Sequence, residues 1–233
     1  MPNTIRLYQA VMLLALSEER GTMNGAYVEY ATAAALLSEL LMHERIAIET
    51  DNKNKVLVMD DSSTDDALLD EALDQIKAAK RQRKLQDWVQ KLGQLKDLKH
   101  KVAQSLADAH IVAAEKEKVL WLFERRVYPE LNPEPEQQIR EGMRSAVMSD
   151  DDAIEPRVAI LVALANSAKL LPQVFTKQEL KQRKKRIEQL EKGEMVSTAA
   201  KQAVAAIEAA VMVAAIMPAI TAASTASCSS TSC

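Results

Sequence analysis

The chain has 233 residues, of which 48% are hydrophobic and 27% charged, so it can build a sizeable core and is too apolar to be disordered. Aromatic residues make up only 3% and glycine only 5 positions, which disfavours an all-β protein and favours a helical one. A formal net charge of −3 gives no general attraction for nucleic acid, and the two cysteines, Cys228 and Cys233, exclude a disulfide framework.

Residues 1–15 lack the pattern of a secretory signal peptide. No basic region precedes their apolar part, and no small-residue cleavage site follows it. We therefore expect a reducing, cytoplasmic setting.

Apolar side chains recur every three or four residues along most of the chain, which is the spacing of one face of an α-helix. This spacing predicts helices over residues 7–16, 26–42, 64–80, 85–92, 95–108, 135–147, 157–171, 177–192 and 195–216. Thr64, Asp65 or Asp66 can cap the third of these helices, and Pro135 and Pro156 suit the first turns of two others. The helix over 157–171 is apolar nearly all round, which predicts a central position.

Two β-hairpins interrupt this helical pattern. Residues 45–50 and 55–60 flank the polar residues 51–54, which predicts the first hairpin. Apolar runs at 111–114 and 119–123 flank the charged residues 115–118, which predicts the second, with the charged residues as its turn. Because residues 119–123 are apolar at every position, both faces of that predicted strand need apolar partners.

The C-terminal segment does not predict a membrane-spanning helix. Its apolar run from Ala209 covers about 15 residues and Pro218 interrupts it, whereas a spanning helix needs about 20. We therefore expect a mainly α-helical protein: a single globular multi-helix domain over residues 1–223 with small antiparallel β-hairpins. A disordered Ser/Thr/Ala-rich tail over 224–233 should follow it.

No catalytic constellation is recognisable in the sequence. It contains no G-x-S-x-G, P-loop or G-x-G-x-x-G motif, and His43, His100 and His110 are scattered without cysteines or carboxylates at metal-ligand spacing. The carboxylates between Asp65 and Asp74 fit helix capping and a solvated face better than acid–base or Mg²⁺ chemistry. We therefore expect no metal, no cofactor and no enzymatic activity, with an unrecognised enzyme as the remaining alternative.

Cations and aromatic residues gather around the second hairpin. Lys96 and Lys99 lie on one flank of the predicted helix before it, and Arg125 and Arg126 follow its apolar strand. This arrangement suits an anionic lipid headgroup, but it also suits an ordinary hairpin packed on a core, which composition alone favours. A winged-helix DNA reader is disfavoured, because the helix has few side chains suited to base edges and the chain is acidic.

The basic run at residues 183–186 is a second cluster of cations. On a helix these four side chains point around most of the circumference and make no single stripe. The run therefore predicts a solvated helix and not a binding surface for nucleic acid or membrane.

Several short segments occur in an order typical of one protein family. They are Leu-Leu-Ala-Leu at 13–16, Leu-Ser-Glu-Leu at 37–40, Thr-Asp-Asp-Ala-Leu-Leu-Asp-Glu-Ala-Leu at 64–73, Trp88, and the helix and hairpin that end at Pro129. In these the chain resembles the Golgi phosphoprotein 3 family, whose Thr-Gly-Asp-x-Leu-Leu-Asp-Glu-Ala-Leu motif falls on residues 64–73. The resemblance runs over residues 7–175 and more loosely through the C-terminal helices.

The resemblance implies a mostly helical domain with small β elements, which binds membranes peripherally through phosphatidylinositol 4-phosphate. The basic pair of the family falls on Lys96 and Lys99. The family's tryptophan after the first helix falls on Asn24 and its second-helix arginine on Ala33, so half of the headgroup site is missing or rebuilt. These departures, and the lack of a long N-terminal extension, are more similar to bacterial members.

The resemblance also implies that the hairpin inserts into the bilayer or mediates oligomer contacts, and its apolar bulk here is Trp121, Leu122 and Phe123. We therefore expect a non-catalytic, cytoplasmic protein that docks peripherally on the cytoplasmic face of a membrane, with an anionic, phosphoinositide-like phospholipid as partner, homo-oligomers, and no nucleic acid. Its headgroup site would comprise Lys96, Lys99, Arg125 and Arg126. The alternative is a soluble scaffold that oligomerises through its apolar hairpin.

Overall fold

The computed structural model describes residues 5–17, 20–25, 27–49, 55–119, 123–151, 154–194 and 204. The elements in chain order are α1 (Leu7–Ala15), α2 (Val28–Met42), β1 (Ile46–Glu49), β2 (Lys55–Val58), α3 (Ala67–Lys77), α4 (Leu85–Gly93), α5 (Leu98–Asp108), β3 (Glu115–Val119), β4 (Phe123–Val127), α6 (Glu134–Met148), α7 (Pro156–Ser167), the 3-10 helix η2 (Leu171–Gln173), α8 (Lys177–Gln182) and α9 (Lys184–Glu191). The mainly α-helical fold with two antiparallel hairpins is confirmed. The helix predicted at 195–216, except for residue 204, and the predicted tail lie outside the described residues.

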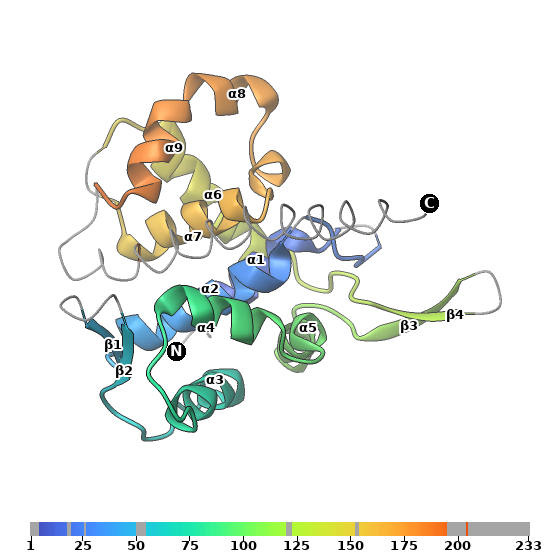
Figure 1. Ribbon diagram of the computed structural model, residues 1–233. Helices are drawn as coiled ribbons and strands as arrows, with labels where there is room; N and C mark the ends of the chain where they lie inside the picture. Colours follow the sequence, from blue (N-terminus) through green and yellow to red (C-terminus); the bar gives the residue numbers. More distant parts are fainter. Residues whose placement is uncertain are drawn as a thin grey trace, which may run out of the picture.

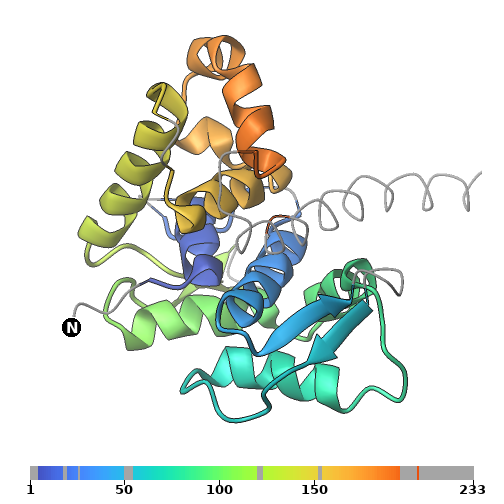
Figure 2. The ribbon, with the colours of Figure 1, turned by 90° about the vertical axis from the view of Figure 1, so that its left-hand side faces the viewer.

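Helices α1 and α2 form the centre of the molecule. Every residue of α1 except Gln9 is buried, and most of the alanines and leucines of α2 are buried with them. Helix α7 packs on both, as its nearly all-apolar surface predicts. Figure 1 shows α6 to α9 on one side of this centre, and α3, α4, α5 and the β1–β2 hairpin on the other. In Figure 2, β1 and β2 lie between α3 and the end of α2.

The helices begin where the capping side chains predict. The Asp66 carboxylate accepts hydrogen bonds from the backbone N–H groups of Leu68 and Leu69 at 3.0 and 3.1 Å, which caps α3. Pro135 and Pro156 lie in the first turns of α6 and α7, as predicted.

Several predicted helix boundaries are wrong: α3 ends at Lys77 and not at 80, and α7 ends at Ser167 and not at 171. Two further differences change the surface of the molecule. Helix α5 begins at Leu98 and not at 95, because Asp97 has a left-handed backbone (φ 58°) that ends the preceding turn. The single charged helix predicted over 177–192 is two helices, α8 and α9, which meet at Arg183. Thr176 and Glu179 form a capping box that starts α8, a signal present in the sequence but not used in the prediction.

The first hairpin is confirmed and the second is placed differently. Strands β1 and β2 pair from Ile46↔Val58 to Glu49↔Lys55, as predicted. In the second hairpin the charged residues 115–118 are not the turn but strand residues of β3, and residues 120–122 between β3 and β4 lie outside the described residues. Polar strands form here because β3 and β4 are exposed to solvent and ion pairs such as Arg125–Glu117 connect them.

Strands β3 and β4, hereafter called the arm (residues 115–119 and 123–127), project away from the helical body (Figure 1). The base of the arm is held by the antiparallel bridge Val112↔Glu130 and by a hydrogen bond from the Tyr128 N–H to the Gly21 carbonyl at 2.8 Å. A Cβ added to Gly21 would lie 2.1 Å from the carbonyl carbon of Tyr128, so only glycine allows this approach. The loop after α1 therefore fixes the base of the arm to the core.

Candidate functional site

The structure separates the two lysines that the resemblance assigns to a headgroup. Lys96 is exposed but precedes α5, so the prediction that it shares a helix with Lys99 is wrong. Lys99 lies on α5 and forms an ion pair with Glu29 of α2. Asn24 is exposed and Ala33 has 0% exposure in the core. Of these four positions, Lys96 alone offers a cation with no ion-pair partner among the described residues.

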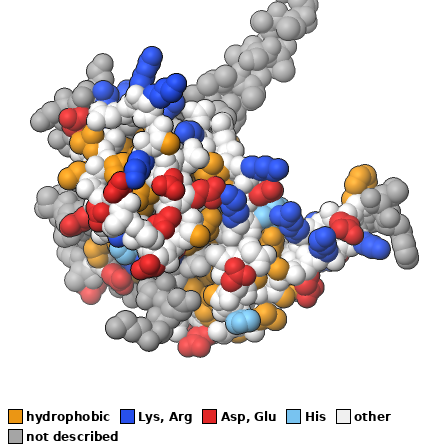
Figure 3. All heavy atoms as spheres, turned by 90° about the horizontal axis from the view of Figure 1, so that it is seen from below, with side chains coloured by type: hydrophobic (Ala, Val, Ile, Leu, Met, Phe, Trp, Pro, Cys, Tyr) orange, Lys and Arg blue, Asp and Glu red, His pale blue; other side chains and the backbone are white. Residues whose placement is uncertain are grey.

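The arm carries the other predicted site residues. Phe123 is 70% exposed and is the first residue of β4, whereas Trp121 and Leu122 lie outside the described residues. The guanidinium of Arg125 is paired with Glu117 across the hairpin, at 2.5 Å from Nη2 to Oε2. Arg126 stands opposite Lys116 in the register. Figure 3 shows basic and acidic side chains alternating along the projecting arm.

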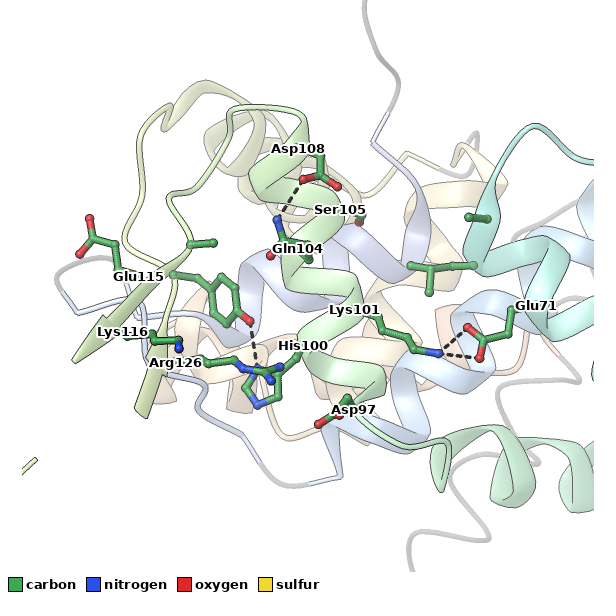
Figure 4. A pocket seen from close by; sticks show the side chains of 14 residues that line it. Glu71, Asp97, His100, Lys101, Gln104, Ser105, Asp108, Glu115, Lys116 and Arg126 are labelled. Carbon is green, nitrogen blue, oxygen red and sulfur yellow. Dashed lines mark hydrogen bonds and ion pairs between the residues drawn. The ribbon is translucent and has the colours of Figure 1, made fainter. Parts of the chain in front are cut away.

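A groove lies where the base of the arm meets the helical body. It has a volume of about 670 Å³. Its walls come from α3, from one face of α5 and from the base of the arm (Figure 4). The residues that carry its chemistry are Glu71, Asp97, His100, Lys101, Lys116, Arg126 and Tyr128.

Several hydrogen-bond donors lie close together at one end of the groove. His100 Nδ1 and the Tyr128 hydroxyl are hydrogen-bonded at 3.0 Å, and Arg126 lies beside the imidazole (Figure 4). Burial, followed by the positive charge of Arg126, lowers the pKa of His100 below its usual 6.5. Burial also raises the pKa of Tyr128, so its hydroxyl keeps its proton. This end of the groove therefore holds a permanent guanidinium charge, a half-buried imidazole and a phenol.

The other end of the groove is already neutralised by internal contacts. Lys101 binds both carboxylate oxygens of Glu71 at 2.6 and 2.7 Å. Gln104 donates to Asp108 at 2.9 Å. These contacts join α3 to α5 and one turn of α5 to the next, and they leave little charge for a ligand there.

A second hollow of about 540 Å³ lies between the start of α1 and the helices α6 and α7. Its lining is mostly apolar, and Arg157 at its edge is held by Glu39 and by the Ile5 carbonyl. Its other charged lining residues, Glu134 and Glu155, are acidic, so the groove at the arm is the stronger candidate for an anionic ligand.

His100, Lys116 and Tyr128 were not selected as binding residues from the sequence. Strand alternation could have identified two of them. Arg126 and Tyr128 are two residues apart and therefore lie on the same face, and Lys116 lies on that face because it pairs with Arg126. This signal needed the correct position of the turn, which the predicted hairpin placed at 115–118. The approach of α5 to the arm is a tertiary contact with no local signature.

Two further classes of site, a metal site and a membrane-spanning helix, are not found among the described residues. No group of three or more His, Cys, Asp or Glu side chains there is arranged to hold a metal ion. None of the helices there combines the length and the apolar character that crossing a bilayer requires.

The sequence was compared with models of protein families. The model of the family described as Golgi phosphoprotein 3 (GPP34) matches residues 7–207. The match covers every helix and strand named above, including the base of the arm and both walls of the groove.

Proposed function

Since the chain belongs to the Golgi phosphoprotein 3 family, we propose that it is a non-catalytic peripheral membrane protein whose arm docks on a bilayer. The partner would be a phospholipid with an anionic headgroup, either phosphatidylinositol 4-phosphate or a similar one. The observation that carries the proposal is the exposed Phe123 in the last described pair, Val119↔Phe123, of a two-stranded arm that projects from the body (Figure 1). An aromatic side chain in this position can enter the interfacial layer of a membrane.

The charge on the arm supports a weak contact. Lys118 and Arg126 have no ion-pair partner among the described residues, whereas Arg125 is paired with Glu117. A free cation near an anionic bilayer contributes about 1 kcal/mol, and burial of one phenylalanine about 2 kcal/mol. Together these give a millimolar affinity for a single copy, so stable attachment requires several contacts or several copies.

Flotation with vesicles tests the proposal. The parent and the variant Phe123→Ser are compared on phosphatidylcholine vesicles with and without phosphatidylinositol 4-phosphate. We expect the parent to bind the anionic vesicles and Phe123→Ser to bind at least about tenfold more weakly, because the burial of the ring is lost. Met59→Ser is the matched control, since Met59 is 63% exposed beside β2 and distant from the arm in the fold. Equal binding by parent and Phe123→Ser, or no binding by the parent, would overturn the proposal.

A second candidate function is a soluble scaffold that oligomerises through its apolar hairpin. Among the described residues, β3 and β4 form a sheet of two strands and pair with no other strand. Each strand therefore has one edge free to pair with a strand of another copy, which favours this candidate. Light scattering separates the candidates. An oligomer that Trp121→Asp dissociates, together with no vesicle binding by the parent, would support the scaffold.

A further inference from the structure

We propose that the groove between α5 and the base of the arm binds a phosphate monoester between Arg126, Lys116 and His100. This site lies on the opposite flank of α5 from the Lys99–Glu29 pair and includes none of the positions Asn24, Ala33, Lys96 and Lys99. The inference rests on the proposed function only for the source of the phosphate, which can be a lipid headgroup or a soluble compound.

The pairing of the arm places two like charges against each other. Lys116 and Arg126 are direct cross-strand partners, an arrangement that destabilises an isolated hairpin. Lys116 forms a long ion pair with Glu124, 3.6 Å from Nζ to Oε2. Arg126 is a hydrogen-bond partner of the Tyr128 hydroxyl and has no ion pair among the described residues. An anion bound between the two cations would convert this repulsion into attraction.

His100 and Tyr128 supply further donors at the same place. The hydrogen bond between them uses His100 Nδ1, which leaves Nε2 for a ligand. The charged groups that influence this imidazole are Arg126 and Lys99, which disfavour its protonation, and Asp97, which favours it. A bound anion would add to the effect of Asp97, so binding should be accompanied by proton uptake at His100.

Three of the four acidic residues that line the groove do not occupy this end, and Asp97 is the one beside His100 (Figure 4). Glu71 is engaged by Lys101 and Asp108 by Gln104, and strand alternation directs Glu115 to the face opposite Lys116. Asp97 is exposed at the start of α5. A guanidinium fork, an ammonium and an imidazole suit the several oxygens of a phosphate dianion better than the two of a carboxylate.

Titration of the full-length protein with inorganic phosphate tests the site. The ring signals of the three histidines are followed by nuclear magnetic resonance and assigned with His→Gln variants. We expect phosphate to move the His100 signal and to raise the pKa of His100. Arg126→Gln and Lys116→Gln should each weaken this response about tenfold. Arg126→Lys, which keeps the charge and loses the fork, should weaken it less. Lys185→Gln, on exposed α9, is the control for net charge.

Two results would overturn the groove site: a His100 signal that phosphate does not move, or a response unchanged in Arg126→Gln. Flotation separates this failure from failure of the membrane function. If Arg126→Gln floats like the parent while Phe123→Ser does not, the groove is not a headgroup site and the membrane proposal stands. If phosphate moves His100 but the parent binds no vesicles, the membrane proposal fails and the groove belongs to a soluble phosphate compound.

Discussion

At the scale of single residues, Glu39 is the carboxylate on which the centre of the fold depends most. Its side chain has 0% exposure and accepts from the Leu7 N–H at 2.6 Å and from Arg157 Nη1 at 3.2 Å. It thereby satisfies the first free N–H of α1 and ties α2 to α7. A buried carboxylate is tolerated here because a guanidinium and a backbone donor both face it.

We expect Glu39→Gln to lower the free energy of unfolding by about 3 kcal/mol, because Arg157 would keep its charge and lose its counter-ion. Urea denaturation followed by circular dichroism measures the change. Glu188→Gln is the control, since Glu188 is half exposed and 3.7 Å from Lys184, where the loss should be below about 0.5 kcal/mol. Equal stabilities of the two variants would show that the buried pair contributes little.

The carboxyl of Glu179 should give a measurable pH dependence. Its hydrogen bond with Arg144, and then those with Thr176, lower its pKa from 4.5 to about 2. The folded-state pKa lies below the unfolded one, so the contribution to stability is complete above pH 4.5 and is lost as the pH falls towards about 2. We therefore expect the parent to be more stable than Glu179→Gln near neutral pH and the difference to shrink through this acidic range. A difference that is constant with pH would contradict the assignment.

At the scale of elements, the basic run at 183–186 divides into two pairs with different roles. Arg183 and Arg186 point inward and donate to the Met148 carbonyl and to the Ala146 and Asp151 carbonyls, at the end of α6. Cations at a helix C-terminus complement its dipole. Lys184 and Lys185 are exposed. The prediction of a fully solvated run was therefore wrong for the two arginines, because their hydrogen bonds to residues 146–151 are tertiary contacts that a local pattern does not show.

Substitutions at neighbouring positions of the run should therefore lower the free energy of unfolding by different amounts. Arg186 is only 8% exposed, so Arg186→Gln should remove its hydrogen bonds to the Ala146 and Asp151 carbonyls and cost about 2 kcal/mol of unfolding free energy. Lys185→Gln should change it by less than about 0.5 kcal/mol. Thermal denaturation of both variants checks this, and a stability loss in Lys185→Gln as large as that in Arg186→Gln would refute the division.

Local sequence signals predict some of the helices and strands correctly and others not. Apolar periodicity and capping residues such as Asp66 predicted the helices and the first hairpin, because these depend on neighbours within a few residues. The second hairpin was misplaced because an apolar run was assumed to be a buried strand, whereas ion pairs allow the charged residues to form solvent-exposed strands. The groove could not be predicted, since His100 meets Arg126 and Tyr128 only through tertiary packing.

At the scale of the whole molecule, the net charge of −3 cannot attract an anionic surface. The proposed attraction to an anionic bilayer would therefore be local and oriented. The arm and the cationic end of the groove lie on the side of α5, whereas α8 and α9 lie on the far side of α1 and α2 (Figure 1). A molecule docked through the arm would hold α8 and α9 away from the bilayer, with their exposed lysines in water.

Hydrogen–deuterium exchange of the full-length protein, with and without vesicles that contain phosphatidylinositol 4-phosphate, tests this orientation most directly. We predict slower exchange of the amides in β3, in β4 and at the start of α5 when the vesicles are present, with no change in α8 and α9. Protection of α8 and α9 with none in the arm would contradict the account.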